Sequence, residues 1–179
     1  MPAVTIQDTD TAWTVRIPRV RTARLVLREP RLADFEAAAS AAADPLATAH
    51  LSGPLDRREA YKRLHVSAGG WVLQGMGWWT VELPDTGPIG SVGVFRRESG
   101  PDVEMGWIIH RAFWGRGFAS EAAGAALGHA VETWRITRVI AHIGQGNVAS
   151  IAVATKLGMR CEGEVDFYGD IDWRYAFGG

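Results

Sequence analysis

The stretch that decides the fold reads WIIHRAFWGRGFASEAAGAAL and runs from Trp107 to Leu127. It starts with the apolar residues of a strand, passes through two glycines separated by one arginine, and ends in small residues at helical spacing. The backbone amides of residues 115–119 can therefore point into one concavity, with the positive end of a helix dipole behind them. Glycine allows positive φ angles and lets a phosphate approach the backbone. Arg116 adds a positive charge at the rim.

Three other interpretations of this loop have to be compared when the loop is taken alone. A tight strand-to-helix turn without a ligand needs the same glycines. A nucleoside-triphosphate loop is set aside because the chain has no GxxxxGK[ST] at this place. A dinucleotide loop is weakly matched, since Ser120 stands where the third glycine of GxGxxG belongs and the strand at 137–143 lacks the acidic residue that holds a ribose. The loop alone indicates an anion site.

Patterns on both sides of the loop predict the other elements. Alternating or β-branched apolar residues predict strands at 13–17, 22–30, 77–83, 88–97, 102–110 and 137–143, and two short strands about Gly169. Helical spacing predicts helices at 31–44, 55–73, 118–134 and 147–159. The fold class is α/β (α+β), with a mixed sheet of about seven strands and about four helices on its faces.

Glycine and asparagine mark five positions in these elements. Gly69 and Gly70 weaken the end of the second helix. Gly106 inside a strand predicts a bulge or a close backbone approach. Asn147 is expected to cap the start of the last helix, and Gly158 to end it in the left-handed conformation.

Composition narrows the class of protein. The chain has 179 residues, formal net charge -1, and 20 acidic against 19 basic residues. This balance gives no global attraction to nucleic acid or to an anionic membrane, and no apolar run reaches the roughly 18 residues of a membrane helix. The single cysteine, Cys161, and the absence of metal-ligand spacing fit a reducing, cytoplasmic setting without a metal. We expect a single domain over 1–179, with an N-terminal extension over about 1–20 that is not a signal peptide.

Three ordered motifs raise the significance of the glycine loop. They are RTARLVLREPRLADFEA at 21–37, VEMGWIIHRAFWGRGFASEA at 103–122 and NVASIAVATKLGMRCEGE at 147–164. Together they resemble the GNAT superfamily of N-acetyltransferases, and within it the RimJ/RimL-like group that acetylates the N-terminal amine of ribosomal proteins. The resemblance covers roughly residues 20 to 177. It implies the GNAT fold, with a mostly antiparallel sheet, and acetyl-CoA as cosubstrate.

The resemblance also implies which residues hold acetyl-CoA. The family uses a loop of pattern [QR]xxGx[GA]; Gly115 and Gly117 match it, Ala112 stands where Gln or Arg is usual, and Arg111 is one place early. The pyrophosphate would rest on the loop amides, and the pantetheine would lie along the preceding strand. A bulge at Gly106 would free an amide for the thioester carbonyl and for the oxyanion. The cofactor-binding candidates are Trp107, Ile108, Ile109, His110, Trp114, Gly115, Arg116, Gly117, Phe118, Ala119, Asn147 and Ser150.

Amide formation needs a neutral amine, a polarised thioester and a proton for the leaving thiolate. An α-amine has a pKa of about 8, so a terminal amine asks less of a base than a lysine, whose pKa is about 10.4. Glu104 is the candidate base, acting through a water, and an ordinary polar residue on a strand face is the alternative. Ser150 is the candidate proton donor to the thiolate, against a plain serine at a helix start. Tyr168 is the rival acid.

The acceptor and the partners are less determined. A primary amine acceptor is expected, either a peptide or protein N-terminus or a small molecule, and a homodimer is compatible with the sequence. The region around 56–63 borders the acceptor in the family, and Trp71, Trp78 and Trp79 are candidates for a pocket wall. Two other function classes stay open at this point: a non-catalytic acyl-CoA-binding or sensing module, and a nucleotide-binding domain.

Overall fold

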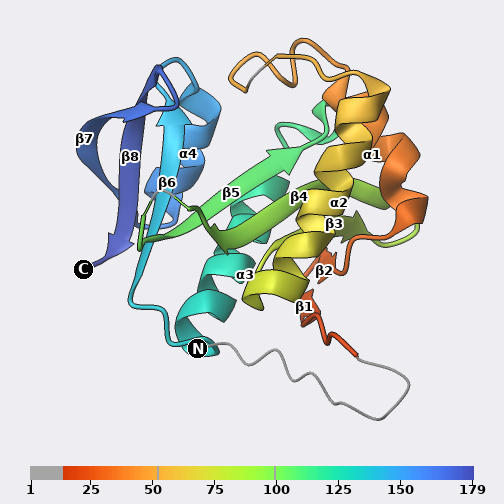
Figure 1. The fold of residues 1–179 in the computed structure, drawn as a ribbon, viewed down its shortest axis with the longest axis horizontal. Coiled ribbons are helices and arrows are strands. Elements are labelled where there is room, and N and C mark those ends of the chain that lie inside the picture. Colours follow the sequence, from red (N-terminus) through yellow and green to blue (C-terminus); the bar gives the residue numbers. More distant parts are fainter. Residues whose placement is uncertain (1–13, 52, 99) are drawn as a thin grey trace.

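A computed structural model describes residues 14–51, 53–98 and 100–179 (Figure 1). An eight-stranded sheet runs through it in the order β1-β2-β3-β4-β5-β6-β8-β7. The strands are β1 (Val20–Arg21), β2 (Val26–Arg28), β3 (Trp78–Leu83), β4 (Gly87–Arg96), β5 (Val103–Ile109), β6 (Arg138–Gly144), β7 (Arg160–Phe167) and β8 (Asp170–Gly178). Neighbouring strands are antiparallel throughout except for β5 and β6, which are parallel.

Four α-helices cover the sheet. They are α1 (Phe35–Ala42), α2 (Arg57–Gln74), α3 (Phe118–Glu132) and α4 (Val148–Lys156), with short 3-10 helices at Leu32–Asp34 and Arg111–Phe113. In Figure 1, α1 and α2 lie in front of β3 and β4, while α3 lies behind the sheet. The prediction of a mixed, mostly antiparallel sheet with about four helices is confirmed, with eight strands where about seven were expected. None of the described helices is long and apolar enough to cross a membrane.

Small side chains let α3 lie close to the sheet. Ala122, Ala123, Ala126 and Ala130 are fully buried at 0 % exposure, and they recur at the spacing of one helix face. This face packs into the same hydrophobic core as the inward side chains of the central strands. The first turn of α3 is thereby held at a fixed place behind β5.

The strand predicted at 13–17 is wrong for the part that the structure describes. Residues 14–17 form no strand, and Trp13 lies outside the described residues. Val15 and Ile17 still pack against the core, which accounts for their apolar alternation. The carbonyl of Pro18 accepts a hydrogen bond from Trp79 Nε1 at 2.7 Å, so this segment is anchored by a side chain rather than by a strand partner.

The other marked positions behave in different ways. The end of α2 is not weakened at Gly69 and Gly70, because the helix continues to Gln74. A Cβ at Gly70 would lie 3.0 Å from the Met76 carbonyl oxygen, so a glycine is needed there for close packing. The two predictions for the last helix are confirmed: Asn147 caps α4, and Gly158 ends it with φ of 77°.

A buried ion pair joins the start of the chain to the sheet. Arg28 on β2 is 4 % exposed and donates two hydrogen bonds of 2.8 Å to Asp34, which is 5 % exposed. Asp34 also accepts from the Arg31 amide and from Thr80 Oγ1 on β3, each at 2.9 Å. All of these donors stabilise the charged carboxylate, so they lower the pKa of Asp34 even though burial alone would raise it.

Candidate active site

The two parallel strands β5 and β6 pair only at their beginnings. Val103 lies opposite Val139, and Glu104 lies opposite Ile140. All residues of both strands are described. Beyond these two pairs, β5 and β6 continue without pairing to each other. Strands that start together and then separate leave a wedge-shaped opening through the sheet.

Backbone groups of β5 line one edge of this opening. The His110 amide donates to the Ile89 carbonyl on β4 at 2.8 Å, and because amides alternate along a strand, those of Trp107 and Ile109 point toward β6. The Ile109 carbonyl points the same way and accepts a hydrogen bond of 2.6 Å from Trp114 Nε1. An extended ligand can therefore pair with this edge as an added strand would.

The glycine loop follows directly and opens α3. Gly115 and Gly117 have φ of +74° and +78°, which strain any other residue, and Gly117 caps the helix without a side-chain hydrogen bond. The first α-helical hydrogen bond runs from the Glu121 amide to the Gly117 carbonyl at 3.1 Å. The three amides at 118–120 thus have no partner within the helix and can donate to an anion, while the anion site expected at the amides of 115–119 stays a prediction.

A side-chain network that sequence reasoning missed fixes this loop to the start of the chain. Arg24 donates through Nε to Glu121 at 2.7 Å and through Nη1 to the Arg116 carbonyl at 3.0 Å. Its guanidinium also lies 4.5 Å from the centre of the Phe118 ring. Glu121 accepts from Thr22 Oγ1 as well. Residues almost one hundred positions apart make these contacts, so no local pattern could have pointed to them.

Gly106 is needed for a close approach and not for a bulge. The register between β4 and β5 runs without a break from Val103 to Ile109, so the predicted bulge is wrong. A Cβ at Gly106 would lie 2.7 Å from Cη2 of Trp78, whose ring lies across the sheet there. Trp78 also stacks on Phe95, with ring centroids 5.4 Å apart. Of the three suspected tryptophans, Trp71 packs in the core, while Trp78 forms a wall.

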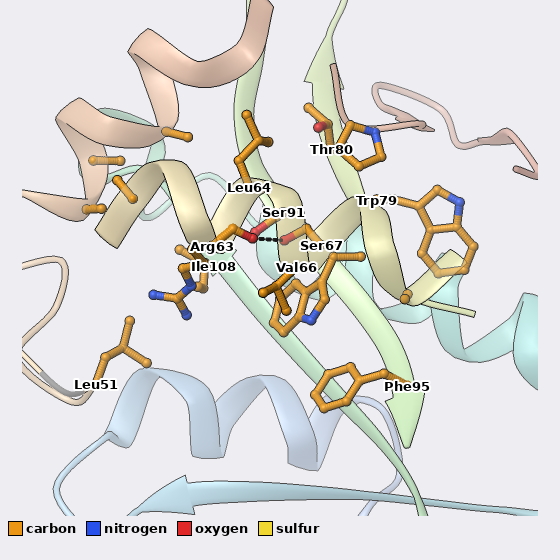
Figure 2. A pocket seen from close by; sticks show the side chains of 18 of the residues that line it. Leu51, Arg63, Leu64, Val66, Ser67, Trp79, Thr80, Ser91, Phe95 and Ile108 are labelled. Atoms are coloured by element: carbon orange, nitrogen blue, oxygen red, sulfur yellow. Dashed lines mark hydrogen bonds between the residues drawn. The ribbon is translucent and has the colours of Figure 1, made fainter. Parts of the chain in front are cut away.

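Two adjoining cavities lie around the opening and under α2. One of about 720 Å³ has the diverging parts of β5 and β6 on its sides and extends to Asn147, Ser150 and Tyr168. The other, of about 410 Å³, lies between α2 and the sheet (Figure 2). Trp78, Phe95, Arg63 and Ile108 border both of them. A molecule held in either cavity can therefore reach the opening from the face that carries α1 and α2.

Glu104 is held by two cationic or titratable neighbours. Arg97 donates to both carboxylate oxygens, at 2.6 and 2.8 Å, and Nδ1 of His142 lies 3.3 Å from Oε2. Burial raises the pKa of Glu104, but the contacts with His142 and Arg97 outweigh burial and lower it overall. Such a carboxylate stays charged and accepts a proton poorly, which argues against Glu104 as the base. Sequence reasoning missed Arg97 and His142, although a histidine inside an apolar strand was a usable signal.

Asn147 and Ser150 come together at the start of α4. The Asn147 Oδ1 accepts a hydrogen bond of 3.1 Å from the Ser150 amide, which leaves the Asn147 side-chain NH₂ as a donor. The Ser150 hydroxyl makes no hydrogen bond to any described residue, so the capping role goes to Asn147 alone. Both residues line the larger cavity.

Tyr168, His110 and Arg111 are less favourably positioned to contact a ligand in the opening. Tyr168 lies on the β7–β8 turn, is 65 % exposed, and donates to Glu98 at 2.8 Å. The His110 amide is used by β4, and its side chain borders the cavity under α2, where burial lowers the pKa of the ring. Arg111 pairs with Asp44 at 2.5 Å, so it does not replace the missing side chain at Ala112.

Comparison with known proteins decides the family. Residues 24–160 match the family model described as Acetyltransferase (GNAT) domain. The chain belongs to the GNAT acetyltransferase family. The match contains the opening, the glycine loop and Asn147, whereas Thr22 and Tyr168 lie outside it.

The GNAT chain is similar to several individual proteins and solved structures. Over 119 aligned residues it is 32 % identical to the uncharacterized protein YkkB of Bacillus subtilis. This alignment covers 65 % of this chain and 69 % of that protein. The crystal structure of an acetyltransferase from Agrobacterium tumefaciens superposes with a TM-score of 0.83 at 28 % identity, over 96 % of this chain and all of that one. RimL, a ribosomal-protein alpha-N-acetyltransferase solved in complex with coenzyme A, has the same fold with a TM-score of 0.73 at 18 % identity, over 90 and 98 % of the two chains.

These findings make the GNAT chain an acetyltransferase enzyme, and acetyl transfer is its general reaction. The alternative of a nucleotide-binding domain is wrong, because the glycine loop belongs to an acetyltransferase domain. The donor, the acceptor and the residues that carry the chemistry are considered next.

Proposed function

We propose that this GNAT acetyltransferase transfers an acetyl group from acetyl-CoA to a primary amine by direct attack in a ternary complex. The acceptor is a peptide or protein N-terminal amine or a small-molecule amine. The observation that carries the proposal is the opening between β5 and β6, since it lets a donor along the strand edges and an acceptor in the cavity meet through the sheet. RimL, an alpha-N-acetyltransferase of a ribosomal protein, shares this fold, which supports including peptide N-termini among the acceptors to test.

The cosubstrate would use backbone groups for most of its contacts. The pyrophosphate would accept hydrogen bonds from amides of Gly115, Arg116, Gly117, Phe118 and Ala119. The Trp114 amide, which the sequence offered as well, already donates to the Arg111 carbonyl at 3.1 Å. The helix dipole contributes only about 0.3 to 1 kcal/mol at an exposed site, so the amide hydrogen bonds provide most of the binding. The pantetheine would pair with the free edge at Trp107 and Ile109, and the Asn147 side-chain NH₂ would donate to one of its carbonyl groups.

The same edge would serve the chemistry. An amide of β5 that points into the opening would donate to the thioester oxygen and, more strongly, to the oxyanion that forms on attack. The Ser150 hydroxyl would donate a proton or a hydrogen bond to the departing thiolate, because it lines the cavity and is not used by the protein. Tyr168 is the second choice for this role, since its hydroxyl already donates to Glu98.

Turnover and binding test the proposal together. The protein is incubated with acetyl-CoA and a panel of peptides and small primary amines, with released thiol as the readout, and calorimetry compares acetyl-CoA with acetyl-pantetheine. We expect thiol release that depends on the amine, and much weaker binding of acetyl-pantetheine, which lacks the pyrophosphate. No turnover together with no binding of acetyl-CoA would refute the proposal. Equal binding of the two donors would show that the glycine loop does not hold the pyrophosphate.

A further inference from the structure

A histidine and a glutamate face each other where β5 and β6 separate. Nδ1 of His142 lies 3.3 Å from Glu104 Oε2, is shielded from solvent, and is not aligned for a hydrogen bond with any described residue. The face of the imidazole ring stacks on the ring of Phe167, with ring centroids 4.4 Å apart and an interplanar angle of 25°. The imidazole is therefore fixed between a carboxylate and an aromatic ring.

The remaining nitrogen of this ring is available to a substrate. Nε2 lies on the opposite edge of the imidazole from Nδ1, and His142 lines the cavity of about 720 Å³ that contains the opening. Glu104 cannot take this role itself, because Arg97 occupies both of its oxygens. In unliganded enzymes catalytic hydrogen bonds are often long and shorten once substrate is bound, so the 3.3 Å contact is compatible with a working pair.

On this geometry we propose that His142 is the general base of the acetyl transfer and that Glu104 is its positioning residue. The proposal rests on the function proposed above. Glu104 would hold the proton of the neutral ring on Nδ1, leave the lone pair of Nε2 toward the acceptor, and stabilise the imidazolium that forms. Arg97 would keep Glu104 ionised and in place.

The proton balance of the step is closed. The nitrogen lone pair of the amine attacks the thioester carbon, a C–N bond forms, and the π electrons move to the oxygen. Nε2 takes one proton from the amine nitrogen. When the C=O bond forms again, the C–S bond breaks with its electron pair on sulfur, and the thiolate takes one proton from the Ser150 hydroxyl or from water. The imidazolium then returns its proton through water to the resulting alkoxide or hydroxide, which restores the enzyme. Amine and thioester give amide and thiol, and no oxidant or metal is needed.

Several charged groups lie near His142, and they would influence any pH dependence of the reaction rate. They are Arg97 directly after β4, Glu104 on β5, and Asp172 and Arg174 on β8, while β7 contributes the apolar ring of Phe167. Arg97 is compensated by Glu104, and Arg174 is compensated by Glu162. Asp172 has no ion pair in the described part of the chain, and burial raises its pKa. Any change in rate with pH therefore has to be compared between variants that differ at one of these groups only.

The pH dependence of kcat/KM separates a base from a structural histidine. The most reactive amine of the panel is compared with an aniline, because an aniline is already neutral where an imidazole titrates. With the aniline, wild-type protein should show an acidic limb, and His142→Gln should lose it together with about 10²- to 10⁴-fold in kcat. Glu104→Gln should move this limb to lower pH, since a neutral amide supports the imidazolium less than a carboxylate does.

Folding and binding controls accompany these variants. His65→Gln changes an exposed histidine on α2 that borders neither cavity, and it should leave both rate and profile unchanged. His142→Ala with added imidazole should recover part of the lost rate, while the Kd of acetyl-CoA stays within about twofold in every variant. An intact acidic limb in His142→Gln, or a rate within twofold of wild type, would overturn the proposal. Turnover by these variants would still support the proposed function.

A different observation concerns the charge of the acceptor. Arg63 on α2 borders both cavities, and in Figure 2 its guanidinium lies between the helix and the loop that carries Leu51. Its side chain is exposed to solvent, and it makes no ion pair within the described residues. The other cations of the larger cavity are paired: Lys62 with Glu59, and Arg97 with Glu104.

We further infer that the acceptor carries an anionic group that binds Arg63. This inference also rests on the proposed function. Across the larger cavity, Asp170 and Asp172 on β8 supply negative charge, which suits an ammonium group before its deprotonation. The aromatic wall of Trp78 and Phe95 lies along the same space. Acceptors that fit are amines with an apolar body and a carboxylate, sulfonate or phosphate at the other end.

Matched acceptors test this inference. 4-(2-Aminoethyl)benzoate, 4-(2-aminoethyl)benzamide and phenethylamine share one aromatic body and differ in the charge at the end remote from the amine, and 4-(2-aminoethyl)benzenesulfonate and 4-(2-aminoethyl)phenylphosphonate distinguish the anions. Wild-type protein should prefer an anionic acceptor by 10-fold or more in kcat/KM, mainly through KM, and Arg63→Gln should remove the preference. Arg58→Gln, on the same helix but outside both cavities, should keep it. An unchanged preference in Arg63→Gln, or none in wild type, would refute this assignment, while turnover of phenethylamine would leave the proposed function standing.

Discussion

At the scale of single residues, Trp78 shapes the wall of the acceptor cavity because two glycines make room for it. A Cβ at Gly93 would lie 2.5 Å from Cδ2 of the indole, and one at Gly106 would lie 2.7 Å from Cη2. Real Cβ atoms do not approach so closely, so the ring would have to move. Since Phe95 stacks on the same ring, a shift of Trp78 would change the aromatic wall of both cavities.

Gly106→Ala should therefore destabilise the protein by about 1–3 kcal/mol, as overpacking of a filled site does. Trp78→Phe lacks the outer ring atoms that collide with the new methyl group, so the cost of Gly106→Ala should be smaller in that background. Urea unfolding of the four proteins of this double-mutant cycle measures the coupling. We also expect the KM of the acceptor to rise more than the Kd of acetyl-CoA, because the ring lies on the acceptor face.

Gly128→Ala on α3 is the matched control for this cycle. Nothing lies within 4 Å of the Cβ that it would add, and the position is helical, so alanine should stabilise the protein by about 0.4–1 kcal/mol. Additive effects of Gly106→Ala and Trp78→Phe would show that the two positions are not coupled through this contact.

At the scale of helices and strands, local patterns predicted what depends on neighbours in sequence. The alanine spacing of α3 and the glycines before it correctly predicted the helix and its start, because hydrophobic periodicity and backbone conformation are local properties. The cap at Asn147 was equally local. The strand predicted at 13–17 failed because alternation reports burial, and an extended segment can bury alternate side chains without a strand partner.

The chemistry of the opening could not be read in the same way. β5 and β6 are separated in sequence by the whole of α3, and their divergence depends on how each strand is held by its other neighbour. Arg97, Glu104 and His142 come from three strands, so the sequence gives the residue types without their contacts. For this reason the sequence offered Glu104 as a candidate base. In the structure, Arg97 and His142 contact it and make it a paired carboxylate.

At the scale of the whole molecule, carboxylates with lowered pKa values join its parts. Asp34 joins β2 to β3, Glu121 joins the start of the chain to α3, and Glu104 joins β4, β5 and β6. In each case contacts with cationic or hydrogen-bonding groups outweigh the effect of burial on the pKa. The folded protein therefore binds fewer protons than the unfolded chain in acid, and its stability depends on these groups staying ionised.

Asp34 is the carboxylate at which this dependence is measured most directly. Its pKa is lower in the folded protein than in the unfolded chain, so its stabilising contribution is complete above about pH 4 and is lost as the pH falls through the lower, folded value. Asp34→Asn should cost on the order of 3 kcal/mol at neutral pH, because Arg28 stays buried without this partner. It should also flatten the acid side of the stability curve. Urea unfolding across the acid range measures both effects, with the exposed Asp85→Asn as a control, and an unchanged slope would mean that the pKa of Asp34 is the same in the folded protein and in the unfolded chain.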